Sequence, residues 1–131
     1  MIKSKYLISD SAAIITTSLN TGWTTSERPE LLFDNSLNTK WCVSVTADSF
    51  PINVTYRLPN NSREVMTQYR IASANDMLAR DCKSWKIYGS NDVENDIWFL
   101  LDTQYFITFT SRKQYLTFSV FNTISYNAYK F

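Results

Sequence analysis

The 131-residue sequence contains no histidine, so it lacks the most common general base and the most common metal ligand of proteins. Catalytic groups built on Ser-His-Asp or Cys-His pairs are therefore impossible in this chain. The sequence also has no glycine-rich phosphate-binding loop and no cysteine pair with zinc-ligand spacing. A pair of carboxylates that hydrolyses a glycoside is still possible. Most aspartates, however, stand beside Asn, Ser or Gly, where a role in a turn accounts for them. We therefore predict that the chain is not an enzyme.

Glycine and proline are scarce, with two and three copies, so Asn and Asp must supply many of the turns. No run approaches the ~20 apolar residues that a membrane span needs. The first ten residues, Met1–Asp10, have no apolar core of signal-peptide length. We expect a chain that is either cytoplasmic or displayed as part of a larger particle.

Charge of neither sign is in excess, because 13 basic and 12 acidic residues leave a formal net charge of +1. No basic block or stripe is present, so nucleic acid is not an expected partner. Apolar residues make up 44% of the chain and aromatic residues 15%, which is typical of a globular protein. The length suits one domain with a substantial core.

Alternation of apolar and polar residues is the main structural signal in the sequence. It runs through Tyr69–Ser73 and Trp85–Gly89, where every second residue would face a core. The segment Gly89–Asp92 has turn chemistry and separates the second run from a third that begins at Trp98. Further strands are expected at residues 12–18, as the first core strand, and at 52–58, 115–121 and 126–131. Short strands with a turn about every ten residues predict an all-β fold, an antiparallel β-sandwich, with Trp41, Trp85 and Trp98 in its core.

Three blocks in order resemble one family. The segment Ser73–Asp76, followed by Arg80-Asp81 and Gly89–Asp92, is similar to the centre of discoidin-type domains, also called coagulation factor type C domains. Leu32–Trp41 and Phe118–Phe131 resemble the blocks that lie before and after that centre. The resemblance implies a jelly-roll, galactose-binding-like β-sandwich over residues 12–131, similar to family-32 carbohydrate-binding modules, with residues 1–11 as an N-terminal arm or edge strand.

The resemblance also implies a binding site in the loops at one end of the sandwich. By position these loops are 19–29, 44–51 and 75–83. Trp23 and Phe50 would offer aromatic surfaces to a sugar, and a polar group would offer hydrogen bonds to its hydroxyls. The polar group consists of Asn75, Asp76, Arg80 and Asp81. The alternatives are that Trp23 packs under its own loop and that Arg80 and Asp81 pair and tie the loop to Asp76.

The oxygen-rich segment that begins at Asp34 is a candidate metal loop. In the family that the sequence resembles, the corresponding loop often holds one structural calcium ion, and the matching ligands would be Asp34, Ser36 and Thr39. The alternative is an Asx turn without an ion, because calcium prefers more charged ligands than this loop offers. Cys42 and Cys82 lie in or beside two of the binding loops, where they are either bonded or free thiols.

The family fold normally ends with one further strand, which this sequence lacks. An absent last strand would leave an unpaired sheet edge. We therefore expect the Tyr126–Phe131 edge, or the Met1–Asp10 arm, to pair with a protein partner or a second copy, unless the arm fills the position within one chain.

Two functions follow from these observations. The first is a module that binds a glycan or glycoprotein surface, and the alternative is a structural or assembly protein of a larger complex or virus particle.

Overall fold

The computed structural model describes residues 12–19 and 24–131. Its strands are short and its helices are single 3₁₀ turns, so no helix in the described part is long and apolar enough to cross a bilayer. The strands are β1 (Ile14–Thr17), β2 (Val54–Arg57), β3 (Glu64–Val65), β4 (Gln68–Ala72), β5 (Trp85–Asp92), β6 (Ile97–Gln104), β7 (Tyr115–Ser119), β8 (Ser125–Tyr126) and β9 (Ala128–Lys130). The 3₁₀ turns are η1 (Thr25–Glu27), η2 (Pro29–Phe33), η3 (Ala47–Ser49), η4 (Pro59–Asn61) and η5 (Leu78–Arg80).

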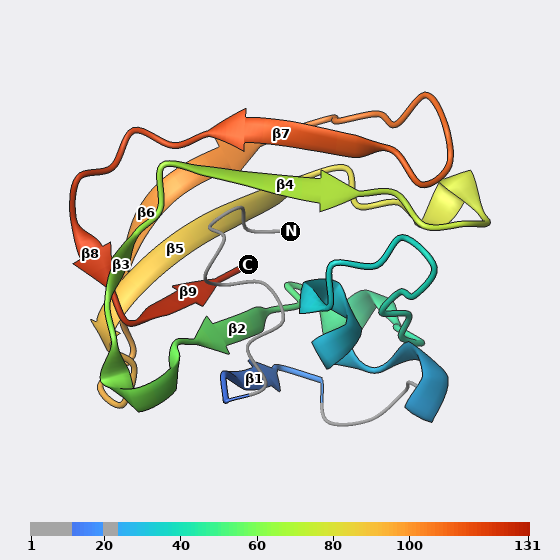
Figure 1. Ribbon diagram of the computed structural model, residues 1–131. Coiled ribbons are helices and arrows are strands. Elements are labelled where there is room, and N and C mark those ends of the chain that lie inside the picture. The colour runs from blue at the N-terminus through green and yellow to red at the C-terminus, as the bar shows by residue number, and fades with distance from the viewer. Residues whose placement is uncertain (1–11, 20–23) are drawn as a thin grey trace.

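The strands form two facing layers. The larger layer is a five-stranded sheet in the order β1-β2-β9-β5-β6, and every pair in it is antiparallel. The pair β4–β7 lies over one face of this sheet, while β3–β8 closes one end (Figure 1). This arrangement confirms the predicted antiparallel β-sandwich.

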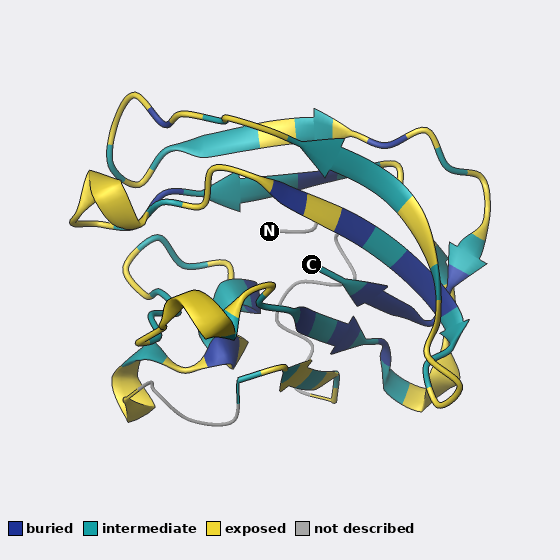
Figure 2. Cartoon of the chain, turned by 180° about the vertical axis from the view of Figure 1, so that it is seen from behind, coloured by how far each residue is buried: buried dark blue, intermediate teal, exposed yellow. Residues whose placement is uncertain are grey.

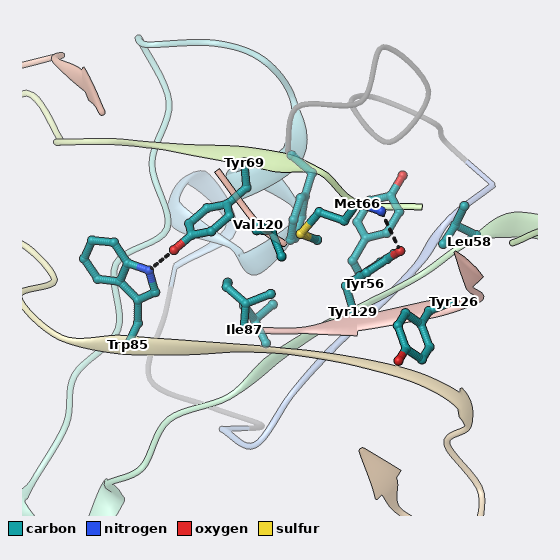
Figure 3. Packing of buried hydrophobic residues seen from close by; sticks show 11 residues of the cluster. Tyr56, Leu58, Met66, Tyr69, Trp85, Ile87, Val120, Tyr126 and Tyr129 are labelled. Carbon is teal, nitrogen blue, oxygen red and sulfur yellow. Dashed lines mark hydrogen bonds between the residues drawn. The ribbon is translucent and has the colours of Figure 1, made fainter. Parts of the chain in front are cut away.

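The core lies between the layers and follows the alternation in the sequence. Val54 and Tyr56 of β2 and Trp85 and Ile87 of β5 are buried, whereas the residues between them are less buried. The same alternation appears as dark blue bands along the strands (Figure 2). Tyr69 enters from the opposite layer and packs against the same cluster (Figure 3). Each such residue removes most of its apolar surface from water, which is the main force that holds the layers together.

Two tyrosine hydroxyls satisfy polar groups inside this core. The Tyr69 hydroxyl accepts a hydrogen bond from Trp85 Nε1 at 2.8 Å and donates one to Asp102 at 2.5 Å. Burial, and then the hydrogen bond to Asp102, raises the pKa of Tyr69 well above its usual range. The Tyr129 hydroxyl accepts from the Met66 backbone N–H and donates to the backbone of β3, and burial raises the pKa of Tyr129 to about 12.

Trp98 was predicted in the core, and this prediction is wrong. Successive residues of a strand point to opposite faces, and Phe99 takes the inner side opposite Gly89, where it stacks against Tyr126. Trp98 therefore lies on the outer face, half-buried, with Lys130 Nζ 4.1 Å from its ring centroid.

Two local predictions also need correction. The segment Gly89–Asp92 continues β5 rather than forming a turn, and the turn comes at 93–96, where the Asp92 carboxylate accepts hydrogen bonds from Asn95. Residues 12–18 do not form a core strand. They contain the edge strand β1, in which Ile15 packs against the core and Ile14 remains 56% exposed.

The predicted edge at Tyr126–Phe131 is likewise wrong. Within this segment β9 pairs with β2 on one side and with β5 on the other, so it lies inside the larger sheet. Phe131 continues the pairing, because its backbone N–H donates to Val54 and its carbonyl accepts from Val54, both at 2.8 Å. Among the described strands of this sheet, the edges are β1 and β6. The Met1–Asp10 arm lies outside the described residues.

The close approach of Gly89 to Tyr126 gives a test of the packing. A Cβ atom at Gly89 would lie 2.4–2.8 Å from three ring atoms of Tyr126. We expect Gly89→Ala to lower the free energy of unfolding by about 2 kcal/mol, because a packed aromatic ring must move. Urea denaturation measures this, and Lys86→Ala on the exposed side of the same strand serves as the control. A Gly89→Ala variant as stable as the parent protein would contradict the packing.

Candidate ligand-binding site

An arginine from outside the predicted site holds the loop 75–83 in place. Both terminal nitrogens of Arg112 donate to the Asp81 carboxylate, at 2.9 and 2.5 Å, and one of them also donates to the Asp76 carbonyl at 3.1 Å. The Asp81 side chain is only 9% exposed. A two-point pair of this kind restricts geometry as well as adding energy. The expected Arg80–Asp81 pair is therefore wrong, because Asp81 has a different partner.

A lysine ties the same loop to the segment before β2. Lys40 Nζ lies 2.5 Å from the Asp76 carboxylate and 3.6 Å from that of Glu27. The hydrogen bond to Lys40 is the main cause that lowers the pKa of Asp76, and the same bond raises the pKa of Lys40. Asp76 is therefore ionised near neutral pH, and a cation already faces its carboxylate.

Arg80 and Asn75 differ from the two aspartates, because their side chains are free to form hydrogen bonds with a ligand. Both residues are exposed, and within the described part of the chain neither side chain makes a hydrogen bond. The charge of Arg80 adds to the lowering of the Asp76 pKa, after the larger effect of Lys40. Arg80 thus offers free donors beside a carboxylate that is held in place from elsewhere.

A cleft of about 210 Å³ runs from this loop into the space between the two layers, where the core residues Val54, Tyr69 and Ile87 line it. Its walls are mainly apolar, whereas Lys40, Arg80 and Asp81 are the charged residues among its lining. Trp41 also lines it and packs against the core, as predicted. Its Nε1 is a buried donor without a partner among the described residues.

Phe50, one of the two predicted aromatic surfaces, is not part of this cluster. Phe50 is 63% exposed, but it is not among the residues that line the cleft beside the loop 75–83. Trp23 lies outside the described residues, so its two alternatives both stand. Lys40 and Arg112 were missed by the sequence analysis, since each meets its partner across more than 30 positions of sequence. No local pattern could have paired them.

The candidate metal loop forms a closed set of hydrogen bonds. The Asp34 carboxylate accepts from the Ser36 backbone N–H at 2.9 Å and from the Thr39 hydroxyl at 2.6 Å, and the Ser36 hydroxyl accepts from the Asn38 N–H. These hydrogen bonds form an Asx turn that needs no ion. The described residues contain no group of three acidic, histidine or cysteine side chains able to hold a metal. Since calcium takes six to eight oxygen ligands, the ion stays a prediction of the resemblance.

The two cysteines do not form a disulfide. Cys42 and Cys82 are both free thiols in the structure, which decides between the two alternatives.

These features describe an antiparallel β-sandwich with polar loops gathered at one end. No protein-family model and no curated protein matches the sequence. Solved structures do share the fold. The family 32 carbohydrate-binding module of Clostridium perfringens NanJ, in complex with galactose, superposes with a TM-score of 0.67 at 14% identity, over 92% of this chain and 80% of that one. The C. perfringens module CpGH89CBM32-5, in complex with GalNAc-β-1,3-galactose, has a TM-score of 0.65 at 14% identity, over 91% and 81%.

The Arg112 pair predicts a loop-specific loss of stability. We expect Arg112→Ala to lower the melting temperature by roughly 5 °C, because Asp81 would keep a poorly solvated carboxylate without a partner. Arg112→Lys should lower it less, since it retains the charge but not the two-point contact. Differential scanning calorimetry measures both, with Lys86→Ala on the exposed side of β5 as the control. Equal melting of Arg112→Ala and the parent protein would show that the pair does not hold the loop.

The Asp34 turn predicts a weak response to calcium. We expect 5 mM calcium chloride, compared with EDTA, to raise the melting temperature by less than ~1 °C, because both carboxylate oxygens already accept hydrogen bonds. Asp34→Asn is the control variant. A larger rise in the parent protein that disappears in Asp34→Asn would establish the calcium site instead.

Proposed function

We propose that this chain is a non-catalytic carbohydrate-binding module that recognises a glycan through the loop end centred on Arg80. The observation that carries the proposal is an exposed arginine, without a hydrogen bond among the described residues, beside a mainly apolar cleft at the loop end of a fold shared with two solved sugar-binding modules. Arginine donors suit sugar hydroxyls, and an apolar wall suits the C–H face of a ring. Galactose and GalNAc-β-1,3-galactose are the first ligands to test.

The two aspartates of the loop act in this proposal as supports. Arg112 engages both carboxylate oxygens of Asp81, and Lys40 engages one oxygen of Asp76, so each carboxylate already pairs with a cation of the protein. They keep the loop rigid, which reduces the entropy lost on binding. Arg80 and Asn75 then make the direct contacts. Phe50 and Trp23 remain candidates for additional contacts from neighbouring loops.

The same electrostatics argue against glycoside hydrolysis. A general acid at this site would need a carboxyl group whose pKa is raised toward neutrality. The pKa of Asp76 is instead lowered by Lys40, and Asp81 is held by a guanidinium. Asp76 is therefore unsuited to donate a proton to a leaving sugar, and the Asp81 carboxylate is already occupied by Arg112.

Arg80→Ala tests the proposal directly. We expect the dissociation constant for the bound sugar to rise about tenfold or more, because one charge-assisted hydrogen bond is lost. Isothermal titration calorimetry with galactose and GalNAc-β-1,3-galactose measures this. Arg63→Ala, an exposed arginine next to β3 at the opposite end of the sandwich, is the matched control (Figure 1). Both variants should melt at the parent temperature. Unchanged affinity in Arg80→Ala would remove Arg80 from the site.

A specific feature favours a second function, that of an assembly protein. The strand β6 is a sheet edge in the described part of the chain, and Ile97–Leu101 carries no charge. Phe99 and Leu100 are 56% and 55% exposed on it. Uncharged apolar edges are sites where another strand can add. Light scattering that shows a stable oligomer, together with no sugar binding by the intact chain, would favour this second function over the first.

A further inference from the structure

Two adjacent aromatic side chains stand exposed just beyond β6. The strand ends at Gln104, which lies opposite Trp85, and the next residues are Tyr105 and Phe106. Tyr105 is 62% exposed and Phe106 88% exposed. Their ring centroids lie 6.4 Å apart with the rings tilted by 41°, so the two side chains form one continuous aromatic surface. We call these two residues the aromatic platform.

The backbone holds the platform in place. The Phe106 N–H donates to the Ser84 hydroxyl at 3.2 Å, and the Ile107 N–H donates to the Lys83 carbonyl at 2.8 Å. Phe106 adopts a φ of 54°, a left-handed conformation that is a genuine outlier for a bulky residue. Burial of the ring does not compensate for this conformation, because the ring is almost fully in solvent. An exposed aromatic residue in an unfavourable backbone conformation points to a role outside the core.

The platform belongs to the same end of the sandwich as the Arg80 loop. Lys83 and Ser84, its two anchors, directly follow that loop in the sequence. The chain that carries the platform continues to Arg112, which is bonded to Asp81 in the loop. Both segments extend past the same ends of β5 and β6 (Figure 1). A ligand held at Arg80 and extended along this end of the molecule would therefore meet the two rings.

We propose that Tyr105 and Phe106 bind a second sugar ring of an oligosaccharide whose first ring is held at the Arg80 loop. This inference rests on the proposed function and adds to it a preference for ligands longer than one sugar. A pyranose presents C–H groups on one face, which pack against an aromatic ring, and hydroxyls at its edge, which the Tyr105 hydroxyl can bond. Two rings form too small an area for a stable protein interface. The balanced charge of the chain gives no attraction to an anionic membrane.

The test compares one sugar with two. We expect the parent protein to bind GalNAc-β-1,3-galactose more tightly than galactose. The double variant Tyr105→Ala with Phe106→Ala should lose about tenfold in affinity for the disaccharide and keep its affinity for galactose. A second variant, Phe106→Gly, should lose disaccharide affinity as well. Glycine adopts positive φ freely, so the loop keeps its shape and the loss reports on the ring alone.

The control is Phe121→Ala, a fully exposed phenylalanine (103%) in the connection between β7 and β8 at the opposite end. It should bind both sugars like the parent protein. The inference is overturned if the platform variants bind the disaccharide normally, or if they lose both sugars equally. Failure of the proposed function can be distinguished from failure of this inference. If the proposed function is wrong, the parent protein binds neither sugar, or Arg80→Ala leaves both affinities unchanged.

Discussion

The hydroxyl of Tyr69 connects the two layers, and the positions of the loops depend on it. Tyr69 belongs to the smaller layer, and its hydroxyl is bonded to Trp85 on β5 and to Asp102 on β6 in the larger one. A buried phenol must find such partners, because its hydroxyl is costly to bury unpaired. The bonds set the distance and register between the layers. Both the Arg80 loop and the aromatic platform adjoin the paired ends of β5 and β6, so the position of each depends on this layer.

Most charged side chains at the loop end pair with one another within the protein. Arg112 and Lys40 occupy the carboxylates of Asp81 and Asp76, whereas Arg80 and Asn75 are exposed and make no side-chain hydrogen bond among the described residues. This division explains how a chain without histidine can still present a polar site. The pairs Arg112–Asp81 and Lys40–Asp76 hold the loop, and Arg80 and Asn75 are left exposed on it. Rigid loops of this kind lose little entropy when they bind.

The fold tolerates wide sequence change because its main requirement is the alternation of apolar residues. The two sugar-binding modules that share the fold are each only 14% identical to this chain. The buried positions of β2 and β5 need side chains of suitable volume and polarity rather than particular residues. Positions in close contact tolerate less sequence change. Gly89 lies against the Tyr126 ring, where any side chain would collide with aromatic carbon atoms.

The sequence by itself determined the all-strand fold and the inward faces of β2, β4 and β5, because the pleat of a strand converts alternation directly into burial. It also located the loop with Arg80 and the Asp34 turn, which depend on neighbouring residues. Only the tertiary structure decided that Asp81 pairs with Arg112, that Trp98 faces outward, and that the last strand lies inside the sheet. These outcomes depend on which strands become neighbours, and that choice is made by the packing of the whole chain rather than by local pattern.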